Sequence, residues 1–166
     1  IVPDLINFVN RAPVTSALVK RLIGIAPQRQ MPAFARETFK SWFSRRASRH
    51  NSARRVILWP DTFNNFFHPE TAKAAVEVLE NAGFEVVVTK VDLCCGRPLY
   101  DYGMMGTAKR WLGQILRELK EEIEAGTPLV GLEPSCLAVF RDELVELFPQ
   151  NEDARRLCKQ SFTLAE

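Results

Sequence analysis

The run Val56-Ile57-Leu58-Trp59, closed by Pro60, decides how the rest of the chain is organised. Four consecutive apolar residues that end at a proline are typical of a short strand buried on both faces, as in a parallel sheet. Similar runs recur at 84–88, Phe-Glu-Val-Val-Val, and at 128–132, Pro-Leu-Val-Gly-Leu. The sequence therefore predicts three short buried strands.

Between and after these strands, apolar residues recur at helical spacing. The pattern predicts helices over 69–82, 107–125, 136–148 and 152–164. Strands that alternate with helices imply right-handed crossovers and a parallel sheet covered on both faces. We therefore predict an α/β fold with three or four parallel strands, helices on both faces and a helical N-terminal arm. We expect at least one strand to come from beyond the C-terminus of this chain.

The N-terminal third differs from the rest in charge. The first 55 residues carry 11 Lys/Arg and 2 Asp/Glu, whereas the remainder carries 11 and 18. Amphipathic spacing over 4–24, interrupted by Pro13, predicts one or two short helices. We divide the chain into a basic helical arm, residues 1–53, and an α/β domain, residues 54–166. The arm either lies along another part of a parent chain or packs on its own domain.

Composition and patterning exclude several classes of function. No apolar stretch is long enough to cross a bilayer, and the start does not resemble a signal peptide. Four unevenly spaced cysteines are not typical of a disulfide framework, so we expect a cytoplasmic protein. No nucleic-acid-binding motif is present, so we expect no nucleic-acid partner. The basic arm leaves peripheral contact with an anionic membrane or with an acidic neighbouring domain open.

Three unusual segments come after the three predicted strands, one after each. They contain Asp61, the run Cys94-Cys95-Gly96-Arg97, and the run Glu133-Pro134-Ser135-Cys136. Because ligands bind beyond the carboxyl ends of parallel strands, we expect these segments to meet at one edge of the sheet. Thiolates are the usual ligands of soft metals and iron–sulfur clusters. Metal ligation and the packing of small apolar side chains beside a turn both remain open on spacing alone.

From Val56 onward the chain resembles the cysteine-rich CCG domain of iron–sulfur oxidoreductases. The family pattern is a Cys, then Cys-Cys-Gly, then Cys-x-x-Cys, with similar gaps between them. The stretches LWPDTFNN at 58–65, CCGRPLYDYGM at 94–104 and GLEPSCLAVF at 131–140 carry the resemblance. They are most similar to the variant that follows an FAD-linked oxidase module and a ferredoxin-like module.

The resemblance implies a place in a larger redox protein. Proteins of this kind resemble D-lactate and glycolate dehydrogenases, which oxidise 2-hydroxy acids. Electrons would pass from FAD, outside this chain, through iron–sulfur clusters toward a quinone or another electron carrier. We expect the chain to be a piece of a longer polypeptide that stops before a second CCG repeat. By itself it is not expected to turn over.

Three cysteines carry over from the family pattern. The resemblance implies Cys94, Cys95 and Cys136 as ligands of an iron–sulfur cluster. Arg97, beside two of these thiolates, would lower their pKa or hold an anionic group of the cofactor.

Two positions depart from the family pattern. Asp61 and Glu133 stand where the family has cysteines, and we expect them to be substitute ligands or to contact the cofactor. Alternatively, the second repeat supplies the missing ligands across an interface. A third interpretation is a degenerate repeat kept as a structural or interaction module. Zinc binding or thiol catalysis at the same cysteines is a fourth.

Overall fold

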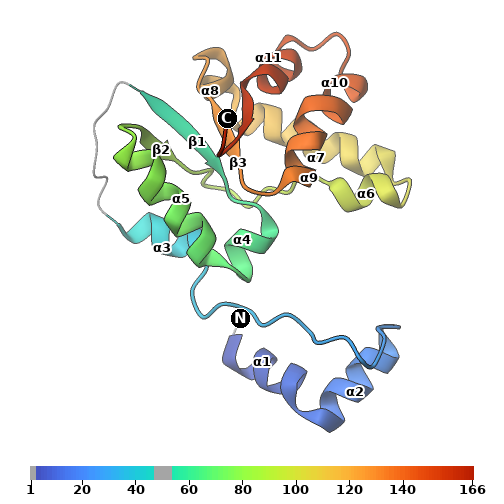
Figure 1. Ribbon diagram of the computed structural model, residues 1–166. Coiled ribbons are helices and arrows are strands. Elements are labelled where there is room, and N and C mark those ends of the chain that lie inside the picture. Colours follow the sequence, from blue (N-terminus) through green and yellow to red (C-terminus); the bar gives the residue numbers. More distant parts are fainter. Residues whose placement is uncertain (1–2, 47–53) are drawn as a thin grey trace.

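Four parallel strands form the centre of the domain. The computed structural model describes residues 3–46 and 54–166. The sheet has the order β2-β1-β3-β4, and each neighbouring pair is parallel. The strands are β1 (Arg55–Trp59), β2 (Glu85–Val87), β3 (Leu129–Gly131) and β4 (Ser161–Thr163). Helices cover both faces (Figure 1), so the predicted α/β fold is confirmed.

The central strand β1 supplies side chains to two separate cores. Successive residues of a strand point to opposite faces of the sheet. Ile57 and Trp59 accordingly belong to one buried cluster, and Val56 and Leu58 belong to the other. All four side chains are at most 2% exposed. A continuous apolar run is therefore what this position in the sheet requires.

The larger core lies between one face of the sheet and the helices of the C-terminal half. These helices are α7 (Met105–Glu118), α8 (Lys120–Glu124), α9 (Pro134–Ala138), α10 (Leu144–Leu147) and α11 (Glu152–Gln160). A π-helical turn, Val139–Glu143, joins α9 to α10. Buried apolar residues three and four positions apart, such as Leu112, Ile115 and Leu116, place one face of each longer helix on the sheet.

The smaller core lies on the opposite face, under α5 (Pro69–Asn81) and α3 (Phe39–Arg45). Phe39 is fully buried there among residues of β1 and α5. Thr38 caps α3 by accepting a hydrogen bond from the N–H of Ser41. Although α3 lies in the sequence of the predicted basic arm, its aromatic face packs on the sheet domain.

Several predicted elements are wrong in their bounds. The helix predicted over 152–164 ends at Gln160, and residues 161–163 form β4 instead. The fourth strand of the sheet thus lies within this chain, where the sequence predicts a helix. The helix predicted over 107–125 starts at Met105 and is interrupted at Leu119. Two short helices, α4 (Thr62–Phe66) and α6 (Arg97–Asp101), occupy stretches outside the predicted helices.

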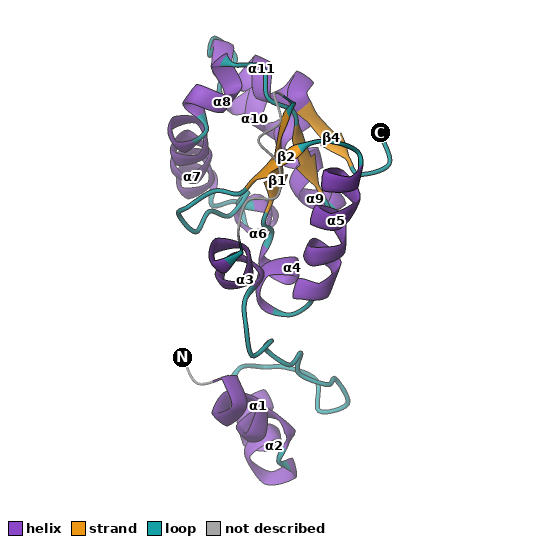
Figure 2. Ribbon diagram, turned by 90° about the vertical axis from the view of Figure 1, so that its left-hand side faces the viewer, coloured by secondary structure: helices purple, strands orange, loops and turns teal. Residues whose placement is uncertain are grey.

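The first two helices stand apart from the sheet domain. They are α1 (Pro3–Arg11) and α2 (Pro13–Leu22), and they appear below the domain in Figures 1 and 2. Asn7 holds the following extended segment by exchanging two 2.8 Å hydrogen bonds with the backbone of Phe34. Next to it, the N–H of Ala35 donates to the carbonyl of Phe66 at the end of α4. Residues 47–53 of the predicted arm lie outside the described residues.

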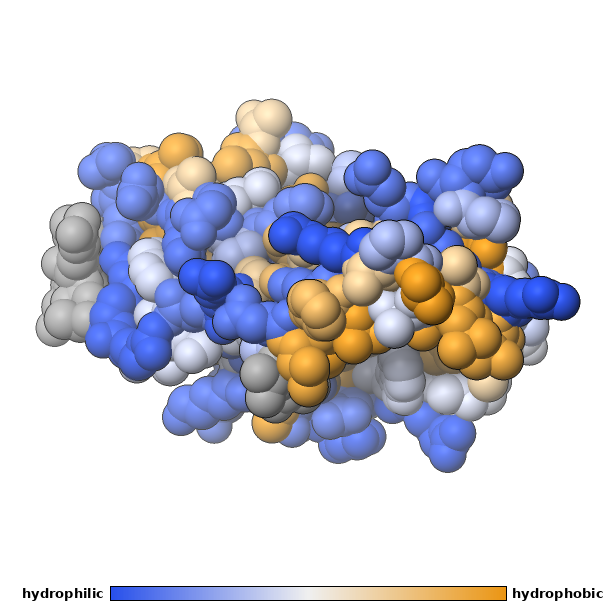
Figure 3. All heavy atoms as spheres, turned by 90° about the horizontal axis from the view of Figure 1, so that it is seen from below, coloured by the Kyte–Doolittle hydropathy of each residue, from blue (hydrophilic) through white to orange (hydrophobic). Residues whose placement is uncertain are grey.

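The surface of α1 and α2 is apolar over much of its area. Figure 3, seen from below, shows hydrophobic spheres gathered between hydrophilic ones on this side of the molecule. The large apolar residues exposed in this part are Leu5, Phe8, Val14, Leu18, Leu22 and Ile23. Among the described residues, no helix has the length and hydropathy needed to span a membrane.

We predict that Phe39→Ala lowers the free energy of unfolding by about 3–5 kcal/mol, because it opens a cavity in the smaller core. Phe8→Ala is the matched control, since Phe8 lies on α1 and is 69% exposed. Urea denaturation followed by circular dichroism measures both. Equal small effects of the two variants would show that α3 does not contribute to the stability of the domain.

Candidate metal centre

The three unusual segments meet at the carboxyl edge of the sheet. The chain leaves β1 into α4, and the hydroxyl of Thr62 at the start of α4 hydrogen-bonds to the thiol of Cys94. Cys94 also contacts Cys95, and Cys95 contacts Cys136, which lies in the first turn of α9 after β3. Three cysteines from two distant parts of the sequence therefore lie side by side.

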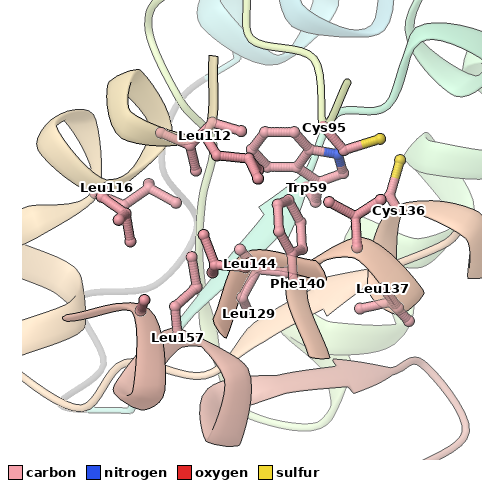
Figure 4. Close-up of a cluster of buried hydrophobic side chains, with 14 of the residues drawn as sticks. Trp59, Cys95, Leu112, Leu116, Leu129, Cys136, Leu137, Phe140, Leu144 and Leu157 are labelled. Atoms are coloured by element: carbon pink, nitrogen blue, oxygen red, sulfur yellow. The ribbon is translucent and has the colours of Figure 1, made fainter. Parts of the chain in front are cut away.

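The thiols form a short row. Cys95 is the middle member and interacts with both Cys94 and Cys136. Figure 4 shows the sulfurs of Cys95 and Cys136 directed to the same side of the larger core. Cys95 is 3% exposed and Cys136 is 6% exposed. Cys94 is half-buried and lines a surface hollow of about 360 Å³ together with Thr62, Phe66, Asp92, Leu93, Trp111 and Gln114. Of the three cysteines, Cys94 is therefore the most accessible to solvent.

Hydrogen bonding and burial keep Cys94 and Cys95 protonated. The hydrogen bond to Cys136, with a smaller contribution from burial, raises the pKa of Cys95 to about 12. The hydrogen bond to Cys95, together with burial, raises the pKa of Cys94 well above its ordinary value. Two backbone N–H groups oppose these shifts. That of Gly96 lies 3.5 Å from the Cys94 sulfur, and that of Arg97 faces Cys95. These amides are placed to stabilise a thiolate once the proton is removed.

Gly96 allows the turn that carries both cysteines. Its φ is +79°, in the left-handed region that residues with a Cβ rarely adopt. The turn leads directly into α6, so the row of thiols is followed by a helix that packs against α7. A side chain at this position would strain the backbone that aims the Gly96 N–H at Cys94.

Asp61 caps the helix that follows β1. Its carboxylate is 2% exposed. Oδ1 accepts from the N–H groups of Phe63 and Asn64 at 3.0 Å, and Oδ2 accepts from Asn64 Nδ2 at 2.7 Å. Both oxygens are thus engaged within α4, which is the ordinary role of an aspartate at a helix N-terminus.

Glu133 and Arg97 are likewise held by neighbours. Glu133 Oε1 accepts from the backbone and the hydroxyl of Ser135 at the start of α9. The Arg97 guanidinium binds Glu143 in the π-helical turn and reaches Asp101 at 3.4 Å. Its side chain therefore joins α6 to the turn after α9, while its main chain faces the thiols.

Sequence reasoning does not assign Trp59 or Thr62 to the site. The pattern places Trp59 only in a buried strand, yet it is the last residue of β1 and so stands at the carboxyl edge. Its indole Nε1 is buried without a hydrogen-bond partner, and so is the Tyr100 hydroxyl. The position of Trp59 directly before Pro60-Asp61 is the signal that the sequence offers.

The donor set suits a soft metal or an iron–sulfur group. Three thiols lie together, and two buried donors near them lack acceptors. The present arrangement is a row, and among residues 3–46 and 54–166 no group of three His, Cys, Asp or Glu side chains is disposed to hold a metal ion. The three thiols are ligands of the type that a soft metal or an iron–sulfur group prefers. To bind such a group together, their side chains would have to turn toward a common point.

In the metal-free protein, we predict slow alkylation of Cys95 at pH 8. A thiol with a pKa of about 12 carries about a thousandfold less thiolate there than one at the ordinary value of 9.0. Mass spectrometry of iodoacetamide-treated protein would map the rate at each cysteine, with half-buried Cys158 on α11 as the internal comparison. The Cys95 rate should keep rising toward pH 12, and a plateau near pH 9 would contradict the protonated row.

We also predict that Asp61→Ala costs about 1 kcal/mol of stability through loss of the cap and leaves metal binding unchanged. Asp61→Asn keeps one accepting oxygen and should lose less. Thermal unfolding and a cobalt titration of each variant provide the two measurements. Loss of cobalt binding in folded Asp61→Asn protein would instead identify the carboxylate as a ligand.

Comparison with known proteins identifies the family of the segment that carries the three cysteines. The family model for the CCG cysteine-rich domain matches residues 61–141. The chain is 25% identical over 132 residues to a subunit of the anaerobic glycerol-3-phosphate dehydrogenase of Escherichia coli, and the match covers 78% of this chain and 33% of that protein. It is 29% identical over 116 residues to lactate utilization protein A of Geobacillus thermodenitrificans, where the match covers 68% and 46%.

The chain thus spans less than half the length of these two relatives. No solved structure matches it. The resemblance noted from sequence is confirmed, since the matched segment contains all three cysteines of the row. Residues 61–141 belong to the CCG family of cysteine-rich domains.

Proposed function

We propose that this domain is the thiolate-rich electron-transfer module of a multi-component oxidoreductase. The convergence of Cys94, Cys95 and Cys136 at one sheet edge is the observation that carries the proposal. One relative is by name part of a dehydrogenase and another a lactate utilization protein, which favours a redox context. The parent would be a flavin-linked oxidoreductase that acts on a 2-hydroxy acid or a related substrate.

In this function the three cysteines hold an iron–sulfur group. When bound, the group supplies one-electron transfer at a potential set by its surroundings. The chain contributes the thiolates, the backbone N–H groups of Gly96 and Arg97 that face them, and a core that excludes water from Cys95 and Cys136. Because Cys94 and Cys95 are protonated without metal, binding releases protons and strengthens as the pH rises.

The remaining partners lie in the parent protein. FAD and a ferredoxin-like module would deliver electrons, and a quinone or carrier would receive them. A second CCG repeat would face the hollow over Cys94, where the row of thiols reaches the surface. We place the protein in the cytoplasm, with peripheral membrane attachment of the parent as the alternative.

A structural module is the second candidate. Asp61 and Glu133, which replace family cysteines, both serve as helix caps, and the thiols stand in a row of hydrogen bonds. Those contacts stabilise the domain without metal. They favour a repeat that has lost its cluster and is kept for packing against its neighbours.

Anaerobic reconstitution with iron and sulfide separates the two candidates. We predict stoichiometric iron and acid-labile sulfide, with an EPR signal in one redox state, for the wild-type chain and for the Cys158→Ala control. Cys95→Ala should lose most of the iron, because it removes the central thiol of the row.

Two outcomes would contradict the electron-transfer proposal. One is equal iron content in Cys95→Ala and wild type, which would place the iron elsewhere. The other is absence of iron from folded wild-type protein, both as this chain and within the full-length parent. The second outcome would establish the structural module.

A further inference from the structure

A buried indole N–H beside the row of thiols lacks an acceptor. Trp59 is 1% exposed, and its Nε1 has no hydrogen-bond partner. An indole N–H can only donate, and leaving it unpaired in a protein interior is costly. Trp59 belongs to the same buried cluster as Cys95 and Cys136. Figure 4 shows its nitrogen on the side where these two cysteines lie.

The ring is fixed in this orientation by packing. Phe140 meets it edge to face, with ring centroids 4.9 Å apart and an interplanar angle of 87°. The backbone of Trp59 is paired in register with Gly131 in β3. The ring is packed against Phe140 and only 1% exposed, so its N–H does not reach solvent and an acceptor would have to come to it.

Other polar atoms near the site do not supply that acceptor. The Tyr100 hydroxyl and Glu143 Oε2 are themselves buried without partners. Tyr100 packs against the same buried cluster. A phenol hydroxyl can turn about its C–O bond and can also accept, whereas the indole N–H only donates and points in the plane of the ring. Sulfur is the acceptor chemistry concentrated on the side that the indole faces.

We propose that the Trp59 indole N–H donates a hydrogen bond to sulfur of the metal group held by Cys95 and Cys136. The inference rests on the proposed function and adds a positioning residue to it. Hydrogen bonds to cluster or thiolate sulfur stabilise the more negative, reduced state and are one of the levers that set a reduction potential. Trp59 would thereby raise the potential of the group and fix its place against the core.

Trp59→Phe tests this, because it keeps an aromatic ring for Phe140 and removes only the donor and part of the ring. Trp42→Phe is the matched control, since Trp42 packs on the opposite core. EPR-monitored redox titration of the reconstituted protein gives the midpoint potential. We expect Trp59→Phe to lower it by about 59 mV, which is a tenfold weaker stabilisation of the reduced state in a one-electron couple. Iron content should stay the same, and the control should titrate as wild type.

A second measurement does not depend on the variant folding. In wild-type protein with ¹⁵N-labelled tryptophan, loading with Cd²⁺ should move the Trp59 indole N–H resonance downfield and leave that of Trp42 in place. An unmoved Trp59 resonance, or an unchanged potential in loaded Trp59→Phe protein, overturns the inference and leaves the proposed function standing. Failure of the folded wild type to bind iron or Cd²⁺, both as this chain and within the full-length parent, overturns both.

Discussion

Burial of β1 on both faces is the constraint from which the rest of the structure follows. Its alternate side chains enter two cores, so helices must cover both sides of the sheet. A sheet covered in this way offers backbone turns and polar side chains only at its ends. The loops after β1, β2 and β3 consequently share one edge. The parallel sheet alone therefore brings the reactive side chains of these loops close together. The same strand ends in Trp59, which makes the core itself one wall of the site.

The charged side chains at this edge of the sheet are each paired with near neighbours. Asp61 and Glu133 each accept hydrogen bonds from the helix that follows them, and Arg97 is neutralised by Glu143. No free carboxylate or guanidinium from these residues therefore acts on the thiols. What acts on them is burial, their mutual hydrogen bonds and the opposing backbone amides. Because metal ligation requires thiolates, loading such a site would release protons from Cys94 and Cys95 and so depend on pH.

Much of this arrangement could be predicted from sequence, for identifiable reasons. Strands β1 and β3 stand out as apolar runs, and their order with the helices predicts a parallel sheet and a shared edge. β4 could not be predicted from Ser161-Phe162-Thr163, because three residues carry too little periodicity and only pairing with β3 decides their state. The break between α7 and α8 at Leu119 could not be predicted either, because Leu119 is buried and continues the apolar face of α7. Hydrogen-bond partners cannot be predicted from the sequence pattern. That Asp61 caps α4, and that the Trp59 nitrogen has no partner, are facts of three-dimensional placement.

The two candidate functions differ in how they explain the same replacements. If the domain were only a scaffold, the caps at Asp61 and Glu133 would suffice, and three apolar side chains could fill the space of the thiols without leaving polar groups unpaired. The larger core instead keeps a half-accessible row of sulfurs, backbone amides aimed at two of them, and an indole donor without an acceptor. Buried unpaired donors are uncommon in native structures, because each one costs stability. A sulfur-rich group at this edge would accept a hydrogen bond from the indole N–H and be stabilised by the backbone amides. Packing alone explains neither the unpaired indole N–H nor the direction of the amides. The unpaired Trp59 donor therefore weighs toward a bound group, even though the two carboxylates have taken up structural roles.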